Sequence, residues 1–497
     1  MLALLALVGC KAAPEEPIDF TAAHMVTQGY WYSRYNFGPV LMSSGAGVEF
    51  DLTDDEKTRA AELSGNGADI GKPFNWKLLS RISTGGDPKQ GAWSDFDSGT
   101  SMEALGWAGM KETQWARQFH VDPHFGSSAD ACEGTDCDIP GAQQRFFGMI
   151  ILSEALVQFN DFDQDRDAYN YGNDVAGHYT MLAAVADLAE IAEGEVLACN
   201  RGDEAGACDE PHSASNRYAP WLEELAPTYI TSGEGAFEFA ARLSGELYDD
   251  RPEPTTVREY AVAIYGLNWY GWAVSGDAVR SEEVRGEMKR LGEELAALDR
   301  GDIIESAYAA RGLVAAAHAN DDDAVLMGEA ETAYNELIDD WDEDTGSFLS
   351  VDTYSTDDVA AIMGALSGAD LHIEGSGALA IQVVAFEHMI NISGLQISAP
   401  ATESFIAAYE QLPSADDTEE LFHRYPLTPE PGTIGKASVF AASITYERDC
   451  VPESTLEIDI EPCWSADADN FDTAGAFHLA DELIWFHDDE VSGFPNF

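Results

Sequence analysis

Two short segments carry side chains whose types and spacing suit a metal or acid–base site. In the first, His120, Asp122 and His124 occupy alternate positions. On an extended segment, alternate side chains project to the same side, and imidazole, carboxylate and imidazole are then a set of metal ligands or acid–base catalysts. The alternative is a loop, since Pro123 interrupts regular strand pairing, in which the two histidines only make hydrogen bonds.

The second segment, residues 160–169, places carboxylates at every second position: Asp161, Asp163, Asp165 and Asp167. Acids spaced in this way in a tight loop can converge on a calcium ion, which prefers oxygen ligands. Calcium is therefore the one cofactor that the sequence suggests. Arg166 stands where an EF-hand loop requires glycine, so the alternative is a solvated loop in an acidic protein.

Carboxylate pairs that serve as the acid and base of a glycosidase are a third possibility. Asp95, Asp97 and Glu103 lie close together in the sequence, near Trp93 and Trp107. Aromatic faces stack on sugar rings, although packing in the core is their commoner role. The chain has 90 acidic residues, so acidic pairs of this kind also arise by chance.

The composition limits the environment in which such sites work. With 26 basic and 90 acidic residues among 497, the formal net charge is −64, while 45% of the residues are hydrophobic. A chain this apolar can bury a large core, and its negative field excludes charge-driven binding of nucleic acids. Because the acids are spread along the whole chain, a salt-adapted, halophilic surface explains them better than calcium or cationic partners do.

The first ten residues form an apolar run that ends in Leu7-Val8-Gly9-Cys10. This ending resembles the lipobox of bacterial lipoproteins, which implies a signal peptide over residues 1–10 and lipidation of Cys10. Residues 11–20 suit a tether. The alternative is an ordinary N-terminal segment that ends in a core cysteine. Since no later stretch is apolar enough to span a membrane, we expect an extracytoplasmic lipoprotein, periplasmic or at the cell surface, whose partner is the membrane.

The other six cysteines fall into three close pairs: Cys132 with Cys137, Cys199 with Cys208, and Cys450 with Cys463. This clustering favours three local disulfides. A zinc site is the alternative, but none of the pairs has the Cys-x-x-Cys spacing. Lipidation and an even number of further cysteines both point to an oxidising compartment.

Helical periodicity dominates the middle of the chain. From 141 to 412, apolar residues recur at spacings of three and four. Helical pairs are predicted at 256–276 with 281–299, at 303–320 with 321–341, and at 355–368 with 377–392.

Glycine recurs at corresponding positions of the first helix of each pair, as Gly266, Gly312 and Gly364. Glycine within a helix costs about 1 kcal/mol relative to alanine. We therefore expect each of these glycines to mark a close contact with a neighbouring helix.

One of these pairs resembles a known architecture. The segments 309–320, 330–334 and 341–348 are similar to a hairpin of the (α/α) toroid proteins, the six-hairpin glycosidase-like architecture, in which a Trp-Asp-x-x-Thr-Gly-x-Phe turn leads from the outer helix back inward. The resemblance implies a mainly α fold whose helical hairpins close into a toroid. We expect an irregular, aromatic-rich portion over 21–140, the toroid over 141–412 and a C-terminal cap over 413–497.

Many toroid proteins degrade or isomerise carbohydrate, so the resemblance implies processing or capture of carbohydrate in the toroid cavity by a hydrolase or lyase. In toroid polysaccharide lyases an asparagine neutralises a uronate and a histidine moves the proton, roles that Asn173 and His178 match in residue type. Helix capping is the alternative for both. Functions of another class are a surface lipoprotein that binds a metal or a protein without catalysis, and a structural envelope protein.

Overall fold

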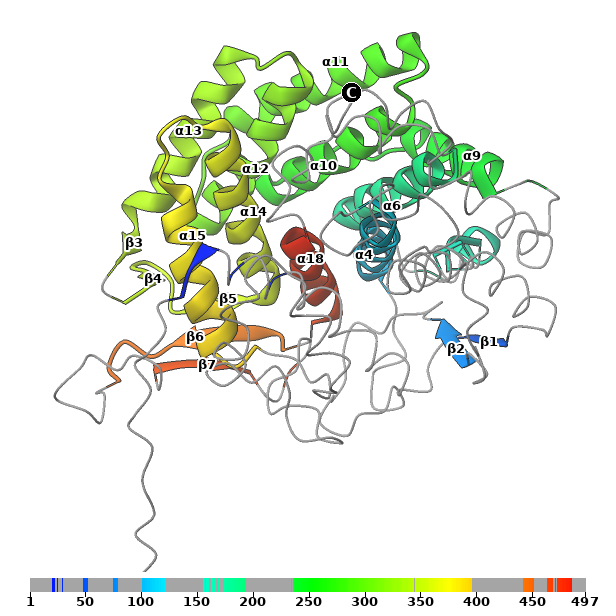
Figure 1. Ribbon diagram of the computed structural model, residues 1–497. Helices are drawn as coiled ribbons and strands as arrows, with labels where there is room; N and C mark the ends of the chain where they lie inside the picture. Colours follow the sequence, from blue (N-terminus) through cyan, green and yellow to red (C-terminus); the bar gives the residue numbers. More distant parts are fainter. Residues whose placement is uncertain are drawn as a thin grey trace, which may run out of the picture.

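A computed structural model describes the chain mainly over seven ranges: 101–121, 174–193, 236–343, 345–395, 441–450, 463–467 and 472–484. Shorter described pieces lie at 20–29, 48–51, 75–78 and 155–169, with gaps, together with 234 and 470. Over these residues the protein is mainly α-helical with small antiparallel sheets (Figure 1). The expected fold class is confirmed at this level.

Six largely buried helices pack on one another in a cyclic order. They are α4 (Met102–Val121), α6 (Val175–Glu193), α10 (Val257–Ala273), α12 (Ile303–Ala319), α14 (Thr356–His372) and α18 (Thr473–Ile484). Each packs on the next in this order, and α18 packs on α4 (Figure 1). We call them the inner helices. Their apolar side chains point in nearly all directions, as expected for helices surrounded by protein.

A second set of helices lies outside them. These are α9 (Ala236–Asp249), α11 (Ala278–Ala296), α13 (Ala324–Asp339) and α15 (Ala378–Phe386), which the π-helix η7 (Glu387–Ile392) continues. We call them the outer helices; α9 packs on α6, α11 on α10 and α12, α13 on α12, and α15 on α14. The periodicity of this segment predicts one buried stripe of six residues: Leu326, Ala330, Ala333, Tyr334, Leu337 and Trp341. Outer helix α13 buries the first five, whereas Trp341 follows the helix and is half-buried.

Polar residues at the helix starts explain part of the acidity. The predicted capping box of α10 is present, because Thr256 accepts the Glu259 N–H while the Glu259 carboxylate accepts the Thr256 N–H. Asp277, Asp302 and Asp323 cap α11, α12 and α13. A carboxylate is favoured there by the free N–H groups and the dipole of the helix.

The three recurrent glycines mark close helix contacts, as expected. A Cβ atom on Gly266 would lie 2.4 Å from the carbonyl oxygen of Tyr179 in α6, and one on Gly312 would lie 3.0 Å from Cα of Ala261 in α10. A Cβ on Gly364 would lie 2.7 Å from Oε2 of Glu482 in α18. Each glycine thus lets one inner helix approach another.

Short strands join and cover the helices. β3 (Trp341–Asp342) and β4 (Ser347–Phe348) form a hairpin after α13, so Trp341 begins a strand rather than ending the helix. β5 (Thr353–Ser355), β6 (Ser443–Tyr446) and β7 (Trp464–Ala466) form a three-stranded antiparallel sheet in that order. β1 (Val48–Asp51) pairs with β2 (Asn75–Leu78).

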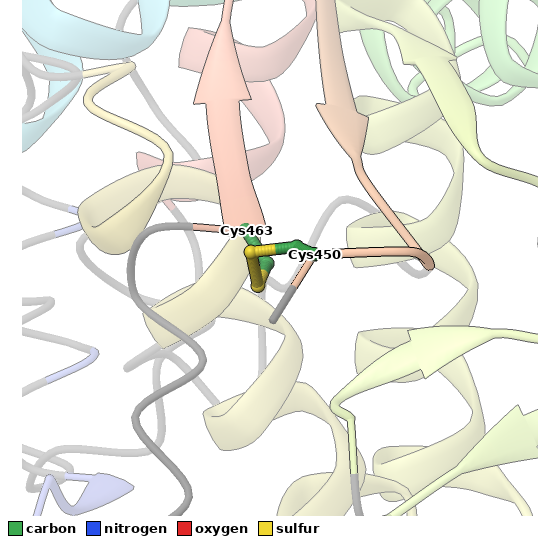
Figure 2. Close-up of a disulfide and its surroundings, with 2 residues drawn as sticks. All are labelled: Cys450 and Cys463. Carbon is green, nitrogen blue, oxygen red and sulfur yellow. A yellow bond between two sulfur atoms is a disulfide. The ribbon is translucent and has the colours of Figure 1, made fainter. Parts of the chain in front are cut away.

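A disulfide joins Cys450 and Cys463, with Cα atoms 5.5 Å apart, across the connection between β6 and β7 (Figure 2). This confirms one of the three predicted pairs. The remaining cysteines lie outside the described residues: Cys10, Cys132, Cys137, Cys199 and Cys208.

The inner helices extend beyond the segment in which helical periodicity was expected. α4 lies within 21–140, which we expected to be irregular, and α18 lies within the expected cap, 413–497. The two pack on each other and on α6 and α14, so segments from both ends of the sequence belong to the helical core. Within the described residues, none of the helices is both long and apolar enough to cross a membrane.

Candidate functional site

Five side chains from five inner helices meet near the helix starts. Glu103, Arg258 and Asp357 lie in the first turns of α4, α10 and α14. Tyr308 of α12 and His478 of α18 lie beneath them, and both are buried. We call these five residues the polar cluster.

Arg258 is the centre of the polar cluster. Its guanidinium donates through Nη2 to Glu103 and through Nε to Oδ2 of Asp357 at 2.9 Å. Tyr308 donates its hydroxyl to the same Asp357 oxygen at 2.5 Å. The Arg258 side chain keeps 34% of its surface exposed, against 16% for Glu103 and 14% for Asp357. The guanidinium is therefore partly exposed to solvent, while both carboxylates are mostly shielded.

The same helix ends bring two further carboxylates close. Asp174 and Asp472 accept the backbone N–H groups of Gly177 and Gly475, at the starts of α6 and α18. A Cβ on Gly177 would lie 2.7 Å from the backbone nitrogen of Glu103. These contacts bring the starts of neighbouring inner helices together at one end of the bundle.

The two carboxylates that contact Arg258 have opposite pKa shifts. Burial raises the pKa of Glu103, and the charge of Arg258 offsets this only in part. Burial alone would also raise the pKa of Asp357, but the charge of Arg258 and the hydrogen bond from His478 hold that pKa well below its usual range. One carboxyl is thus suited to donating a proton and the other to remaining ionised.

A second layer of charged residues lies below the polar cluster. Glu482 of α18 accepts two N–H groups of Arg311, with N–O distances of 3.1 Å. Tyr265 donates its hydroxyl to Oδ2 of Asp481 at 2.5 Å. Burial raises the pKa of Asp481 to about 7, assisted by the neighbouring charge of Glu482.

His478 connects the two layers. Its Nδ1 lies 2.8 Å from Oδ1 of Asp357, and its Nε2 lies 3.7 Å from Oε1 of Glu482. The ring stacks on Trp107, with centroids 4.0 Å apart and planes within 14° of parallel. Burial by itself would lower the pKa of His478, but the hydrogen bond to Asp357 and the nearby carboxylate of Glu482 raise it to about 9.

His120 was expected on an extended segment with Asp122 and His124, but α4 continues to Val121, so His120 lies in the last turn of a helix. A metal or acid–base role of the three residues stays a prediction. Asp122 and His124 lie outside the described residues.

His178, expected as a lyase base, lies between α6 and α9. Its Nε2 is 2.7 Å from the carbonyl oxygen of Leu247, and its ring meets Tyr179 edge to face. Burial lowers its pKa. These contacts give His178 a packing role in the described structure. Asn173 lies outside the described residues.

In the segment expected as a calcium loop, the described part contains arginine pairs, and the calcium site stays a prediction. Asp163 accepts from Arg166 at 2.6 Å and from Arg242 at 2.9 Å, so both of its oxygens are engaged. Asp165 lies in the same turn. Asp161 and Asp167 lie outside the described residues. In the part of the chain that the structure describes, no three His, Cys, Asp or Glu side chains are arranged to hold a metal.

The sequence indicates some residues of the site and not others. Glu103 was among the expected acids, and Trp107 was noted only as an aromatic residue. Arg258, Asp357 and His478 were not anticipated, because first-turn acids and residues of a capping box are ordinary features of helix starts.

Comparisons with known proteins return no family model, no curated protein and no solved structure that matches this chain. The functional assignment therefore depends on the chain's own residues.

Proposed function

We propose that the inner helices form the closed inner wall of an (α/α) toroid, with the outer helices around it. The cyclic order of their contacts supports closure, since α18 packs on both α14 and α4. The hairpin of β3 and β4, with Gly346 in the left-handed region at φ 61°, matches the inward turn of the toroid resemblance.

We propose that the protein cleaves glycosidic bonds at the polar cluster. Glycosidases use one carboxyl group that stays protonated until it donates to the leaving oxygen, and one carboxylate that activates water or attacks the sugar. Glu103 is the proton donor and Asp357 is the ionised partner. The observation that carries this assignment is the contact of both carboxyl groups with the same, partly exposed guanidinium of Arg258. The raised pKa of Glu103 and the lowered pKa of Asp357 support it.

The charge of the polar cluster favours a hydrolase over a polysaccharide lyase. A lyase needs a group that neutralises the uronate carboxylate of its substrate. Arg258 already contacts the carboxylates of Glu103 and Asp357, and Asp174 and Asp472 add negative charge nearby. The surroundings therefore suit a neutral or amino-substituted sugar rather than a uronate.

We further propose that this enzyme is an extracytoplasmic lipoprotein anchored through Cys10. The lipobox-like sequence supports the anchor, and the Cys450–Cys463 disulfide is typical of an oxidising compartment. At that location the acidic surface meets the salt of the external medium directly.

The direct test is incubation of the protein with a panel of neutral, amino-substituted and acidic polysaccharides, with and without EDTA. We expect hydrolysis of at least one neutral or amino-substituted glycan, and a loss of about 100-fold or more in Glu103→Gln and Asp357→Asn. Glu238→Gln, at an exposed first-turn position of α9, is the matched control and should keep full activity. If no glycan is turned over and none shifts the melting temperature, the proposal fails.

A further inference from the structure

Basic and acidic side chains alternate along a line of contacts. The line runs from the interior of the inner helices to the partly exposed guanidinium of Arg258 and its partner Glu103. The line runs through Arg311, Glu482, His478, Asp357, Arg258 and Glu103. It crosses four interhelix contacts, because these residues come from α12, α18, α14, α10 and α4. Apart from the carboxyl groups, the imidazole of His478 is the one group of the line whose ordinary pKa lies near neutral pH.

We propose that His478 is a positioning residue, present as a doubly protonated imidazolium that keeps Asp357 ionised and fixes the direction of its carboxylate. The catalytic consequence rests on the proposed function of Asp357. The charge state of His478 and its effect on Asp357 can be measured without a substrate.

The geometry favours protonation of both ring nitrogens. Nδ1 lies within hydrogen-bond distance of a carboxylate oxygen of Asp357, at 2.8 Å, and Nε2 lies at the longer, ion-pair distance of 3.7 Å from one of Glu482. A neutral imidazole has one N–H and one lone pair, so either tautomer would direct a lone pair at a carboxylate. The imidazolium avoids this repulsion.

Neighbouring residues hold the ring and both carboxylates in place. Trp107 stacks on the imidazole, where an indole face favours a cation. Arg311 holds Glu482 through two nitrogens. Tyr308 also lies nearly parallel to the imidazole, with centroids 6.4 Å apart.

The carboxylate of Asp357 is consequently divided between two partners. Oδ1 receives the His478 proton, and Oδ2 receives those of Arg258 and Tyr308. Without the imidazolium, Oδ1 would lose its donor in a buried position, which raises the pKa of the acid and releases its rotation.

Among the described residues, the charged groups around the imidazole are Asp357 of α14 and Glu482 and Asp481 of α18. Arg311 of α12 lies on Glu482, and Arg258 of α10 and Glu103 of α4 lie beyond Asp357. A pH titration of His478 is therefore interpreted together with the titration of these neighbouring groups.

The experiment is NMR of protein with ¹⁵N-labelled histidine and ¹³Cγ-labelled aspartate, with signals assigned by substitution. We expect both His478 ring nitrogens to be protonated at pH 7.5. In His478→Gln, which keeps one donor but removes the charge, the titration midpoint of Asp357 should rise by about one pH unit or more. His372→Gln, at a half-buried histidine of α14 outside the line, is the control and should leave Asp357 unchanged.

A neutral His478 ring at pH 7.5, or an unchanged Asp357 midpoint in folded His478→Gln, would overturn the inference. His478→Phe, which keeps the stacking on Trp107, provides a second variant if the first unfolds, and the same rise is expected in it. If both NMR results hold and no glycan is hydrolysed, the positioning role of His478 stands and the proposed function fails. If a glycan is hydrolysed, the acidic limb of kcat should move to higher pH in His478→Gln, with little change in KM.

Discussion

Arginine–carboxylate pairs occur in two regions of the molecule with similar geometry and different surroundings. In the interior, Arg311 binds Glu482, and their side chains are only 10% and 6% exposed. On outer helix α11, Arg290 contacts Glu253, Glu287 and Glu294 at 2.8–2.9 Å, but its side chain is 37% exposed and that of Glu253 is 74% exposed. We call Arg290 and these three glutamates the outer cluster. Judged by N–O distance alone, its ion pairs would be stronger than the Arg311–Glu482 pair.

Because the interior pair is buried, loss of one of its partners should cost more free energy than the same loss in the outer cluster. A surface pair contributes up to about 1 kcal/mol and is screened by salt. A buried pair contributes little over an apolar replacement, but loss of one partner leaves an unpaired charge in a poorly solvated place. The interior pairs therefore restrict which substitutions and protonation states are tolerated. The outer pairs mainly neutralise part of the negative charge of the surface.

The largest effect should follow from breaking the buried pair. Arg311→Met leaves Glu482 without its guanidinium, and we expect a loss of about 3–5 kcal/mol in the free energy of unfolding. The double variant Arg311→Met, Glu482→Met should recover most of that loss, because neither charge remains. Denaturant unfolding of the two variants measures this. A double variant as unstable as the single one would show that packing, rather than the unpaired charge, accounts for the loss.

The next largest effect is a loss of stability in alkaline solution. The pKa of His478 is raised from 6.5 to about 9, so its contribution is complete below about pH 6.5 and disappears as the pH rises through 9. The shift corresponds to about 3 kcal/mol. Asp481, raised from 3.8 to about 7, acts in the same direction.

Unfolding free energies measured from pH 6.5 to 9.5 test this. The wild type should become less stable across the range, and His478→Gln should show a flatter curve. Equal slopes for the two proteins would show that His478 does not cause the loss of stability in alkaline solution.

Two glycines give a second contrast between an inner and an outer helix. A Cβ on Gly312 of α12 would press on backbone of α10, whereas nothing lies within 4 Å of one on Gly328 of α13. We expect Gly312→Ala to destabilise the protein by about 1–3 kcal/mol and Gly328→Ala to stabilise it by up to about 1 kcal/mol. Thermal unfolding of both variants distinguishes them, and the same sign for both would contradict the inner packing.

The smallest effect belongs to the outer cluster. Arg290→Gln should cost no more than about 1 kcal/mol in dilute buffer, and less at molar salt, because exposed pairs are screened. Wild-type stability should itself rise with salt beyond about 0.5 M as repulsion among the surface acids is screened. A salt-independent melting temperature in the wild type would leave the charge of −64 unexplained.

The sequence predicts the hairpins well because their signals are local. Periodicity and the Thr256–Glu259 capping box depend on neighbours a few residues apart, and Gly266, Gly312 and Gly364 each occupy the same place within their own helix. The stripe of α13 and the Cys450–Cys463 pair are local in the same sense, and the structure agrees with both.

The polar cluster was not predictable in this way, because its contacts are distant in sequence. Arg258 lies 155 residues from Glu103, and His478 lies 121 residues from Asp357. Carboxylates in the first turn of a helix are also common for electrostatic reasons alone, so Asp357 does not stand out among 90 acids. Only packing of α18 between α14 and α4 brings these groups together.

In the proposed function, Glu103 donates a proton to the leaving group of a glycoside. The most direct measurement compares Glu103→Gln with wild type on two substrates with the same sugar, an unactivated oligosaccharide and an aryl glycoside whose leaving group needs no proton. We predict that kcat falls by about 10²- to 10⁴-fold on the oligosaccharide and little on the aryl glycoside. Equal losses on both substrates, or no loss on either, would contradict the assignment.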